Sequence, residues 1–153
     1  MFKFNLINKP KFLVIDSTII TEIFKLVNIL VDIKQKGILN LVFVSNAEIQ
    51  ALNKQYRHIN KETDVLSFYY FDDFSNLKSS EVAGEIVFSS EKIKKQAKEF
   101  NNSNEEELYK LLVHSVLHII GFDHETDEDY EFMKDKEDEV IIKINKKFLI
   151  NIK

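Results

Sequence analysis

Three of the four histidines of this chain fall in one short segment, H-S-V-L-H-I-I-G-F-D-H, which spans residues 114–124. His114 and His118 are four residues apart, so on a helix their imidazoles project from the same face, one turn apart. Gly121 can take the left-handed conformation that ends a helix and turns the chain, which lets His124 approach the same point from a loop. The spacing therefore predicts three converging imidazole nitrogens.

The chemistry of three such nitrogens is that of a catalytic metal site. A shell of three histidines leaves one position of a tetrahedral zinc ion open for water, as catalytic zinc sites do and structural ones do not. Such an ion can polarise a substrate oxygen and lower the pKa of bound water toward neutrality, so we expect a hydrolytic reaction. Neutral imidazoles also suit nickel, copper and iron, so the histidines alone do not identify the metal.

The residues around the histidines separate two classes of hydrolase. Zinc peptidases of the H-E-x-x-H type place a glutamate, the general base, directly after the first histidine. Here that position is Ser115, which cannot replace a carboxylate as base. A zinc peptidase or amidase is thus an alternative that lacks its proton-transfer group. Asp123 and Glu125 flank the third histidine and are candidates for orienting it or for handling a proton, although Asp123 would equally suit a turn cap.

A second group of candidate residues lies upstream, in N-x-x-Y-R-H over residues 53–58 and T-D-V-L-S-F over residues 63–68. An arginine suits a phosphodiester because its planar fork donates two hydrogen bonds to phosphate oxygens and stabilises charge in the transition state. Taken alone, Arg57 would be interpreted as a surface salt-bridge residue and His58 as a solvated loop residue. These segments by themselves do not choose between the two interpretations.

Length and composition predict one domain. The chain has 153 residues, of which 44% are hydrophobic and 30% charged, enough for one well-buried core and too few for two ordinary domains. We therefore expect a single domain over residues 1–153. The absence of cysteine excludes a disulfide framework, a thiolate nucleophile and any zinc finger that uses cysteine. The metal must be held by nitrogen and oxygen.

Charge and hydropathy narrow the location and the partners. A formal net charge of -4 excludes a nucleic-acid binder of the histone or basic-tail kind, although Lys54, Arg57, His58 and Lys61 could form a local basic surface. No segment approaches the roughly 18 to 20 uninterrupted apolar residues of a membrane span. The first fifteen residues lack the apolar centre of a secretory signal. We expect a cytoplasmic protein that does not bind a membrane.

Apolar periodicity and capping signals predict the elements that position these residues. Strands are expected within residues 2–6, 38–44, 63–71 and 84–89, with a polar loop over 72–80 between the last two. Helices are expected from a cap at Ser17 or Thr18 toward Gly37, over 46–56 and 104–121 after capping boxes at Ser45 and Ser103, over 90–100, and after a cap at Thr126. Apolar residues cover most of the circumference of the helix that carries the histidines, so this helix should be central. The order predicts an α+β fold: a small mixed four-stranded sheet packed with about five helices.

Four motifs in this order, N-x-x-Y-R, T-D-V-L-S-F, G-E-I-V-F-S and the histidine segment, resemble the YbeY family of bacterial endoribonucleases, closely from about residue 41 to 125. The resemblance implies a zincin-like fold, one zinc ion per chain held by His114, His118 and His124, and a functionally required Arg57. It also implies single-strand-specific cleavage of RNA in the 3′-end maturation of 16S ribosomal RNA and in ribosome quality control. The implied partners are precursor ribosomal RNA and, with it, the ribosome or small-subunit proteins and assembly factors.

Two positions depart from the family pattern. Members usually have glycine where this chain has Ser115, and proline where it has Glu62. Since Ser115 is also small, we expect the metal site to persist, whereas Glu62 adds flexibility and a negative charge near the expected phosphate path.

Two questions about the reaction stay open in the sequence. The group that attacks the phosphodiester is either a metal-activated hydroxide or a 2′-hydroxyl of the substrate, and the sequence does not choose between them. A third interpretation is a non-catalytic ribosome-assembly factor whose metal only stabilises the fold.

Overall fold

A computed structural model describes residues 1–31, 34–122 and 125–153 of the chain. In this part of the chain, four strands and five helices follow one another in the order expected from the sequence. The strands are β1 (Lys3–Ile7), β2 (Ile38–Val44), β3 (Val65–Tyr69) and β4 (Val82–Ser89). The helices are α1 (Ser17–Leu30), α2 (Asn46–Arg57), α3 (Ser90–Phe100), α4 (Asn104–Ile119) and α5 (Asp127–Phe148). The prediction of an α+β fold is confirmed.

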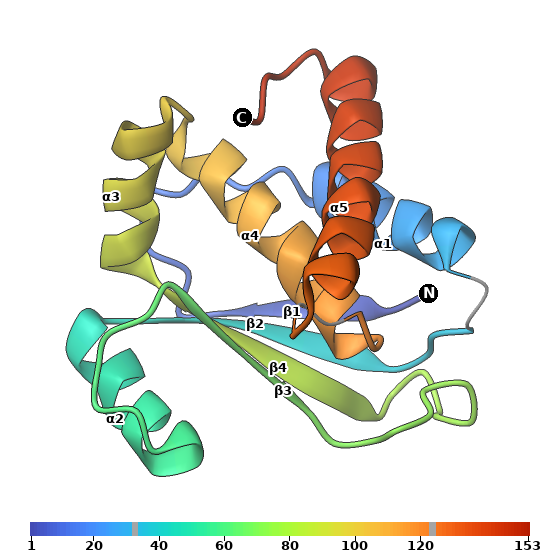
Figure 1. Ribbon diagram of the computed structural model, residues 1–153, viewed down its shortest axis with the longest axis horizontal. Helices are drawn as coiled ribbons and strands as arrows, with labels where there is room; N and C mark the ends of the chain where they lie inside the picture. Colours follow the sequence, from blue (N-terminus) through green and yellow to red (C-terminus); the bar gives the residue numbers. More distant parts are fainter. Residues whose placement is uncertain (32–33, 123–124) are drawn as a thin grey trace.

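The four strands form one mixed sheet in the order β1-β2-β4-β3. β1, β2 and β4 run parallel, and β3 runs antiparallel to β4 with Phe68 opposite Glu85. β3 is therefore an edge strand, paired on one side only (Figure 1). Side chains alternate between the two faces of a strand, so β3 presents one set of residues to each side of the sheet.

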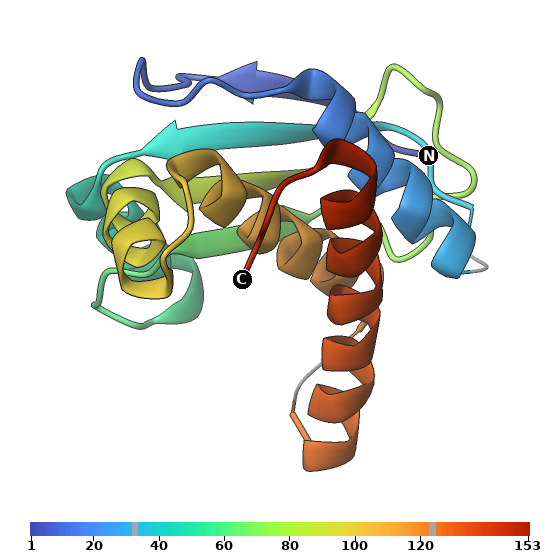
Figure 2. The same cartoon turned by 90° about the horizontal axis from the view of Figure 1, so that it is seen from above.

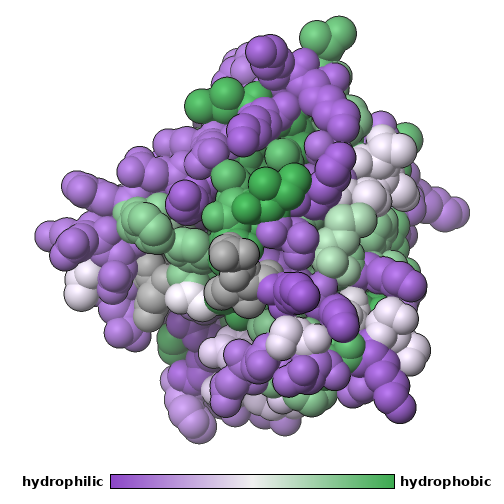
Figure 3. All heavy atoms as spheres, turned by 90° about the vertical axis from the view of Figure 1, so that its right-hand side faces the viewer, coloured by the Kyte–Doolittle hydropathy of each residue, from purple (hydrophilic) through white to green (hydrophobic). Residues whose placement is uncertain are grey.

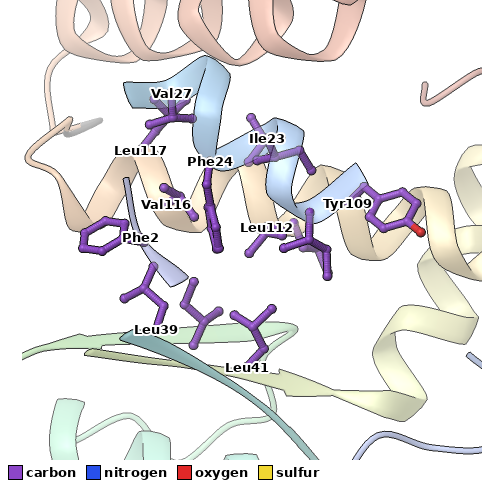
Figure 4. Packing of buried hydrophobic residues seen from close by; sticks show 14 of the residues in the cluster. Phe2, Ile23, Phe24, Val27, Leu39, Leu41, Tyr109, Leu112, Val116 and Leu117 are labelled. Carbon is purple, nitrogen blue, oxygen red and sulfur yellow. The ribbon is translucent and has the colours of Figure 1, made fainter. Parts of the chain in front are cut away.

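Helices cover the two faces of the sheet unequally. α1, α4 and α5 lie on one face, where they build the large core with residues such as Phe24, Leu39 and Leu112 (Figures 1 and 4). α2 lies on the opposite face, over a small buried cluster of Ile49, Leu66 and Val87. Seen from above, α5 projects beyond the body of the molecule at its N-terminal end (Figure 2). The helix that carries the histidines, α4, is central, as its all-round apolar surface predicts.

Local capping signals account for where the helices begin. Ser45 and Ser103 each form a capping box with the glutamate three residues later, and Ser89 and Thr126 accept hydrogen bonds from backbone N–H groups in the first turns of α3 and α5. The predicted cap of α1, Ser17 or Thr18, is wrong by one or two residues. Its cap is Asp16, whose carboxylate accepts the N–H of Thr18 at 2.9 Å, a stronger acceptor than the hydroxyls that follow.

Two further expectations differ from the structure. α1 ends at Leu30, earlier than the apolar spacing toward Gly37 suggested, and Val31 at its end is already extended. The segment 72–80, expected to be a polar loop, buries Phe74 and Leu77 in the main core with 3% and 7% of their surface exposed. Two apolar side chains in a polar stretch are too few to give a periodic signal, so only the folded chain reveals this anchoring.

The outer surface is mainly hydrophilic. On the face seen from the right-hand side of Figure 1, hydrophilic side chains dominate and apolar ones show between them in patches (Figure 3). None of the helices in the described part of the chain is both long enough and apolar enough to cross a membrane.

Candidate active site

One cleft brings together motifs that lie far apart in the sequence. Its volume is about 720 Å³, and residues of α4 and α5 line it together with the end of α2, the segment before β3 and β3 itself. Among the lining residues, Arg57, Lys110, His114, His118 and Glu137 have side chains that could bind a phosphate or a metal ion or orient a ligand. The arginine of the upstream motif and two of the three predicted metal ligands therefore line the same cleft.

α4 presents its histidines as the spacing predicts. His114 and His118 lie one turn apart and both line the cleft. Just beyond the helix, Gly121 has a φ of 110°, and its N–H donates to the carbonyl of His118 at 3.1 Å. The N–H of Phe122 donates to the carbonyl of Leu117 at 3.1 Å, which closes the helix end. The predicted glycine turn after the second histidine is confirmed.

Glu137 of α5 holds the ring of His114. Oε1 of Glu137 lies 2.5 Å from Nδ1 of His114, and the glutamate side chain is only 15% exposed. A carboxylate that accepts a hydrogen bond from Nδ1 selects the tautomer whose Nε2 carries the lone pair, which is the form that can coordinate a metal ion. Glu137 is 23 residues from His114, so no local spacing in the sequence connects the two, and only the fold reveals the contact.

The donor chemistry of α4 fits a zinc ion. Two imidazoles share one helix face, and a carboxylate orients one of them, the arrangement found around zinc-bound histidines. The third predicted ligand, His124, and its neighbour Asp123 lie outside the described residues, and Glu125 is exposed. Among the described residues, no three His, Cys, Asp or Glu side chains are placed to hold a metal ion together. The three-histidine site thus stays a prediction.

Arg57 lies on the opposite side of the cleft, as the last residue of α2. It is exposed, and within the residues that the structure describes it forms no ion pair, so the salt-bridge interpretation is not supported. The next residue, His58, takes the left-handed conformation with a φ of 59° and ends the helix, with its N–H donating to the carbonyl of Lys54. His58 therefore has a structural role at the end of α2, and Arg57 lines the cleft.

Asn53, the first residue of the N-x-x-Y-R motif, has a structural role. Its side chain is buried, with 2% of the residue exposed, and its Nδ2 donates to the carbonyl of Lys61 at 3.0 Å. Its own carbonyl accepts the N–H of Ile59 at 3.3 Å. Two hydrogen bonds thus hold the loop that follows Arg57 against α2. Asn53 positions the arginine without facing the cleft itself.

Asp64 anchors the start of β3. One carboxylate oxygen accepts the N–H of Val65 at 2.8 Å, and the other accepts the side-chain amide of Gln96 at 3.2 Å. Its carbonyl accepts the N–H of Ser89 in β4 at 2.9 Å. These bonds fix the strand that runs along the cleft, so the aspartate of T-D-V-L-S-F has a clear structural role.

Lys110 is a second cation of the cleft that the sequence analysis missed. It precedes His114 by four residues on α4, and its Nζ lies 3.8 Å from the centre of the Phe100 ring. The ring restrains the ammonium group near the cleft. The same four-residue spacing that links the histidines would have found Lys110. Because Arg57, Lys110, Asp64 and Glu137 all line it, the cleft contains both signs of charge rather than a uniform basic field.

The two departures from the family pattern have distinct surroundings. Ser115 is 1% exposed and is not part of the cleft lining, so position 115 faces the core and a larger side chain there would have to displace it. Glu62 pairs with Lys92 of α3 at 3.2 Å. The charge of Glu62, expected to disturb a phosphate path, is thereby partly compensated.

Comparison with known proteins gives a consistent picture. The model of the family "Endoribonuclease YbeY" matches residues 8–145 of the chain. The Endoribonuclease YbeY of Clostridium beijerinckii is 40% identical over 131 residues, covering 74% of this chain and 78% of that protein. The Endoribonuclease YbeY of Clostridioides difficile is 43% identical over 108 residues, covering 69% and 71%.

A solved structure resembles the fold. The solution structure of TM1509 from Thermotoga maritima superimposes with a TM-score of 0.60 at 27% sequence identity. The match covers 95% of this chain and 91% of that protein, so it extends over the sheet and the helices on both of its faces.

Proposed function

The chain belongs to the YbeY family of endoribonucleases, and on that premise we propose that it cleaves single-stranded RNA in the cleft, with one zinc ion held by His114, His118 and His124. Membership of the family, and with it the class of enzyme, agrees with the expectation from the sequence motifs. The zinc, its third ligand and the choice of single strands are our proposal.

The observation that carries the proposal is the meeting of Arg57 with His114 and His118 in one cleft. These residues come from helices on opposite faces of the sheet, and folding places them around one space. An arginine that can donate hydrogen bonds to two phosphate oxygens, in the same cleft as two imidazoles that can bind a metal ion, suits a phosphodiester better than a peptide.

Each residue has a distinct task in the proposed reaction. Bound zinc would supply a Lewis acid for a phosphate oxygen and would lower the pKa of water. Glu137 holds the His114 ring so that Nε2 faces the ion, and Arg57 donates to the nonbridging phosphate oxygens and stabilises the charge that grows on them. Lys110 adds a second positive charge beside the same phosphate path. A substrate 2′-hydroxyl and water remain alternative attacking groups, and their products differ.

The alternative of a zinc peptidase keeps the H-x-x-x-H helix in its favour but lacks a general base at the expected position. The general base of the H-E-x-x-H enzymes would have to stand at position 115, and Ser115 is buried away from the cleft. The carboxylate that does reach the site, Glu137, is engaged by His114. The alternative of a non-catalytic assembly factor, whose metal only stabilises the fold, predicts zinc binding without RNA cleavage.

As the biological substrate we propose precursor 16S ribosomal RNA at its 3′ end, processed in the cytoplasm in contact with small-subunit proteins or assembly factors and serving ribosome quality control. This part of the proposal rests on the resemblance of the motifs to the family. The sequence and the cleft supply the chemistry, and the choice of RNA follows from the family.

The proposal is tested by zinc content and RNA cleavage measured on the same preparations. Arg57→Ala should keep its zinc and lose cleavage of single-stranded RNA, because the arginine contacts only the phosphate. His114→Ala should lose both. Lys98→Ala, an exposed lysine of α3 outside the cleft, is the control and should resemble the wild type. Equal cleavage by all variants would indicate a contaminating nuclease, and zinc without cleavage in the wild type would favour the structural-metal interpretation.

A further inference from the structure

Three aromatic side chains gather beside Arg57 at the edge of the sheet. Tyr56, in the last turn of α2, is 58% exposed, and its ring centre lies 5.2 Å from that of Phe68 in β3, with the ring planes at 68°. Tyr70, directly after β3, is 56% exposed. We call Tyr56, Phe68 and Tyr70 the aromatic shelf.

Tyr70 belongs to this group by its surroundings. Partial burial, the charge of Glu85 with its hydrogen bond, and the nearby Tyr56 hydroxyl all raise the pKa of Tyr70. Glu85 stands opposite Phe68 in the β3–β4 pairing, so its side chain points to the same face of the sheet as Phe68. The three rings therefore lie together on the α2 face, next to the edge that β3 leaves open.

Packing does not explain why two of these rings are exposed. The apolar cluster beneath α2 is closed by Ile49, Leu66 and Val87, with 0%, 3% and 4% of their surfaces exposed. Phe68 packs against this cluster, and Tyr56 lies on Phe68 with more than half of its own surface in solvent. Exposed neighbouring aromatic rings beside a functional cleft are typical of a ligand surface.

The position of the shelf indicates the kind of ligand. Tyr56 and Phe68 line the same cleft as the two histidines, and Tyr56 directly precedes Arg57. A nucleotide whose phosphate contacts Arg57 would carry its base toward the neighbouring ring. Two further exposed cations, Lys54 in α2 and Lys61 in the loop after it, are close to Arg57 in the sequence, so this segment complements a phosphate backbone better than an apolar peptide.

We propose that the aromatic shelf binds a nucleobase of single-stranded RNA by stacking on Tyr56, next to the phosphate held by Arg57. This subsite rests on the proposed function and adds a recognition element to it. A duplex cannot supply the base, because its bases are paired and stacked on one another, whereas a single strand can turn a base out onto an aromatic ring. The shelf thus gives a physical reason for preferring single strands, and stacking accepts every base.

The test combines variants of Tyr56 with RNA that lacks one base at a time. Binding of a labelled single-stranded oligoribonucleotide is measured on ice by fluorescence anisotropy for the zinc-loaded protein, and cleavage is followed in parallel. Tyr56→Phe keeps the ring, whereas Tyr56→Leu keeps an apolar cover over Phe68 without an aromatic face. Phe12→Leu, which replaces a partly buried ring in the turn between β1 and α1, outside the cleft lining, is the control.

We expect Tyr56→Leu to bind the intact RNA about 5- to 100-fold more weakly than the wild type, and Tyr56→Phe and Phe12→Leu to bind it almost unchanged. An abasic nucleotide at one or two positions should weaken the wild type by a similar factor and leave Tyr56→Leu unaffected. Equal affinity of Tyr56→Leu and wild type, or equal losses at every abasic position in both, would overturn the subsite. Base-dependent binding without cleavage would instead contradict the proposed nuclease function and leave the subsite standing.

Discussion

The two sides of the cleft are built in opposite ways. The metal side is α4, whose histidines project from a helix that is otherwise enclosed by the large core between the sheet, α1 and α5. The phosphate side is the end of α2 with β3, supported by a buried cluster of three residues and exposed along Arg57 and Tyr56. A metal site requires fixed nitrogen positions, whereas a surface for a flexible strand can be open. The difference indicates a rigid catalytic side facing an accessible binding side.

Truncation of a buried leucine on each side should show the difference in rigidity between the two sides most strongly. Leu112 of α4 is fully buried in the large core, and Leu66 of β3 is 3% exposed in the small cluster. We expect Leu112→Ala to lower the free energy of unfolding by about 4 kcal/mol and Leu66→Ala by about 2 kcal/mol, because the smaller cluster can relax around its cavity. Urea denaturation of both variants measures the two values. Equal losses would mean that the two sides are equally rigid.

Removal of Glu137 should weaken the metal side without unfolding it. Glu137→Ala leaves Nδ1 of His114 without its carboxylate, and zinc affinity should fall about 10- to 100-fold, with Glu137→Gln in between. Competition with a chromophoric chelator measures the affinity. Glu139→Ala, which removes a half-buried carboxylate two residues farther along α5 and outside the cleft lining, is the control and should bind zinc as the wild type does. Wild-type affinity in Glu137→Ala would show that the contact does not orient the histidine.

Neutralisation of Lys110 should have a smaller effect, on RNA rather than on zinc. A phosphate contact to a single strand contributes roughly 0.7 to the slope of log affinity against log salt concentration. Lys110→Gln should reduce the slope by about this amount and keep its zinc, and Lys98→Gln should change neither. Titration of RNA binding at several salt concentrations gives the slope. An unchanged slope would place Lys110 outside the RNA path, and lost zinc would assign it to the metal side.

The smallest expected effect concerns Glu106, the carboxylate of the capping box at the start of α4, and the pH dependence of the melting temperature. Partial burial raises the pKa of Glu106, but backbone hydrogen bonds from Ser103 and Asn151 outweigh it, and the pKa ends below its usual 4.5. A lowered carboxyl pKa contributes stability that is present above the usual value and is lost as pH falls through the lowered one. Glu106→Gln should therefore flatten the acid decline of the melting temperature below pH 4.5.

Glu99→Gln, which alters an exposed carboxylate of α3, is the matched control for this pH effect and should keep the wild-type decline. An acid decline of Glu106→Gln as steep as that of the wild type would mean that the capping carboxylate does not couple α4 to pH. In that case the hydrogen bond from the N–H of Asn151 would not help to anchor the metal side.

Features within one helical turn could be predicted from the sequence. The caps at Ser45, Ser103 and Thr126, the shared face of His114 and His118, and the turn at Gly121 each depend on residues at most four positions apart. Local sterics and hydrogen bonds decide them, so spacing alone reveals them. The first cap, at Asp16, was misplaced because several cap-forming residues stand in a row there and sequence alone does not rank them.

Features that join distant elements could not be predicted in this way. Glu137 meets His114 through the packing of α5 on α4, and the aromatic shelf forms only because α2 and β3 lie side by side. Arg57 was assigned a function through the resemblance to a family, since an exposed arginine carries no local sign of its task. The sequence thus predicts the shared face of His114 and His118 and the turn after them, but not the residues that other elements bring to them.

The most direct test of the central claim is RNA cleavage measured as zinc is returned to the metal-free protein. If His114, His118 and His124 hold the ion that works opposite Arg57, cleavage of single-stranded RNA should rise in proportion to bound zinc and level off at one zinc per chain. Full cleavage by the metal-free protein, or none in the zinc-loaded one, would contradict the account.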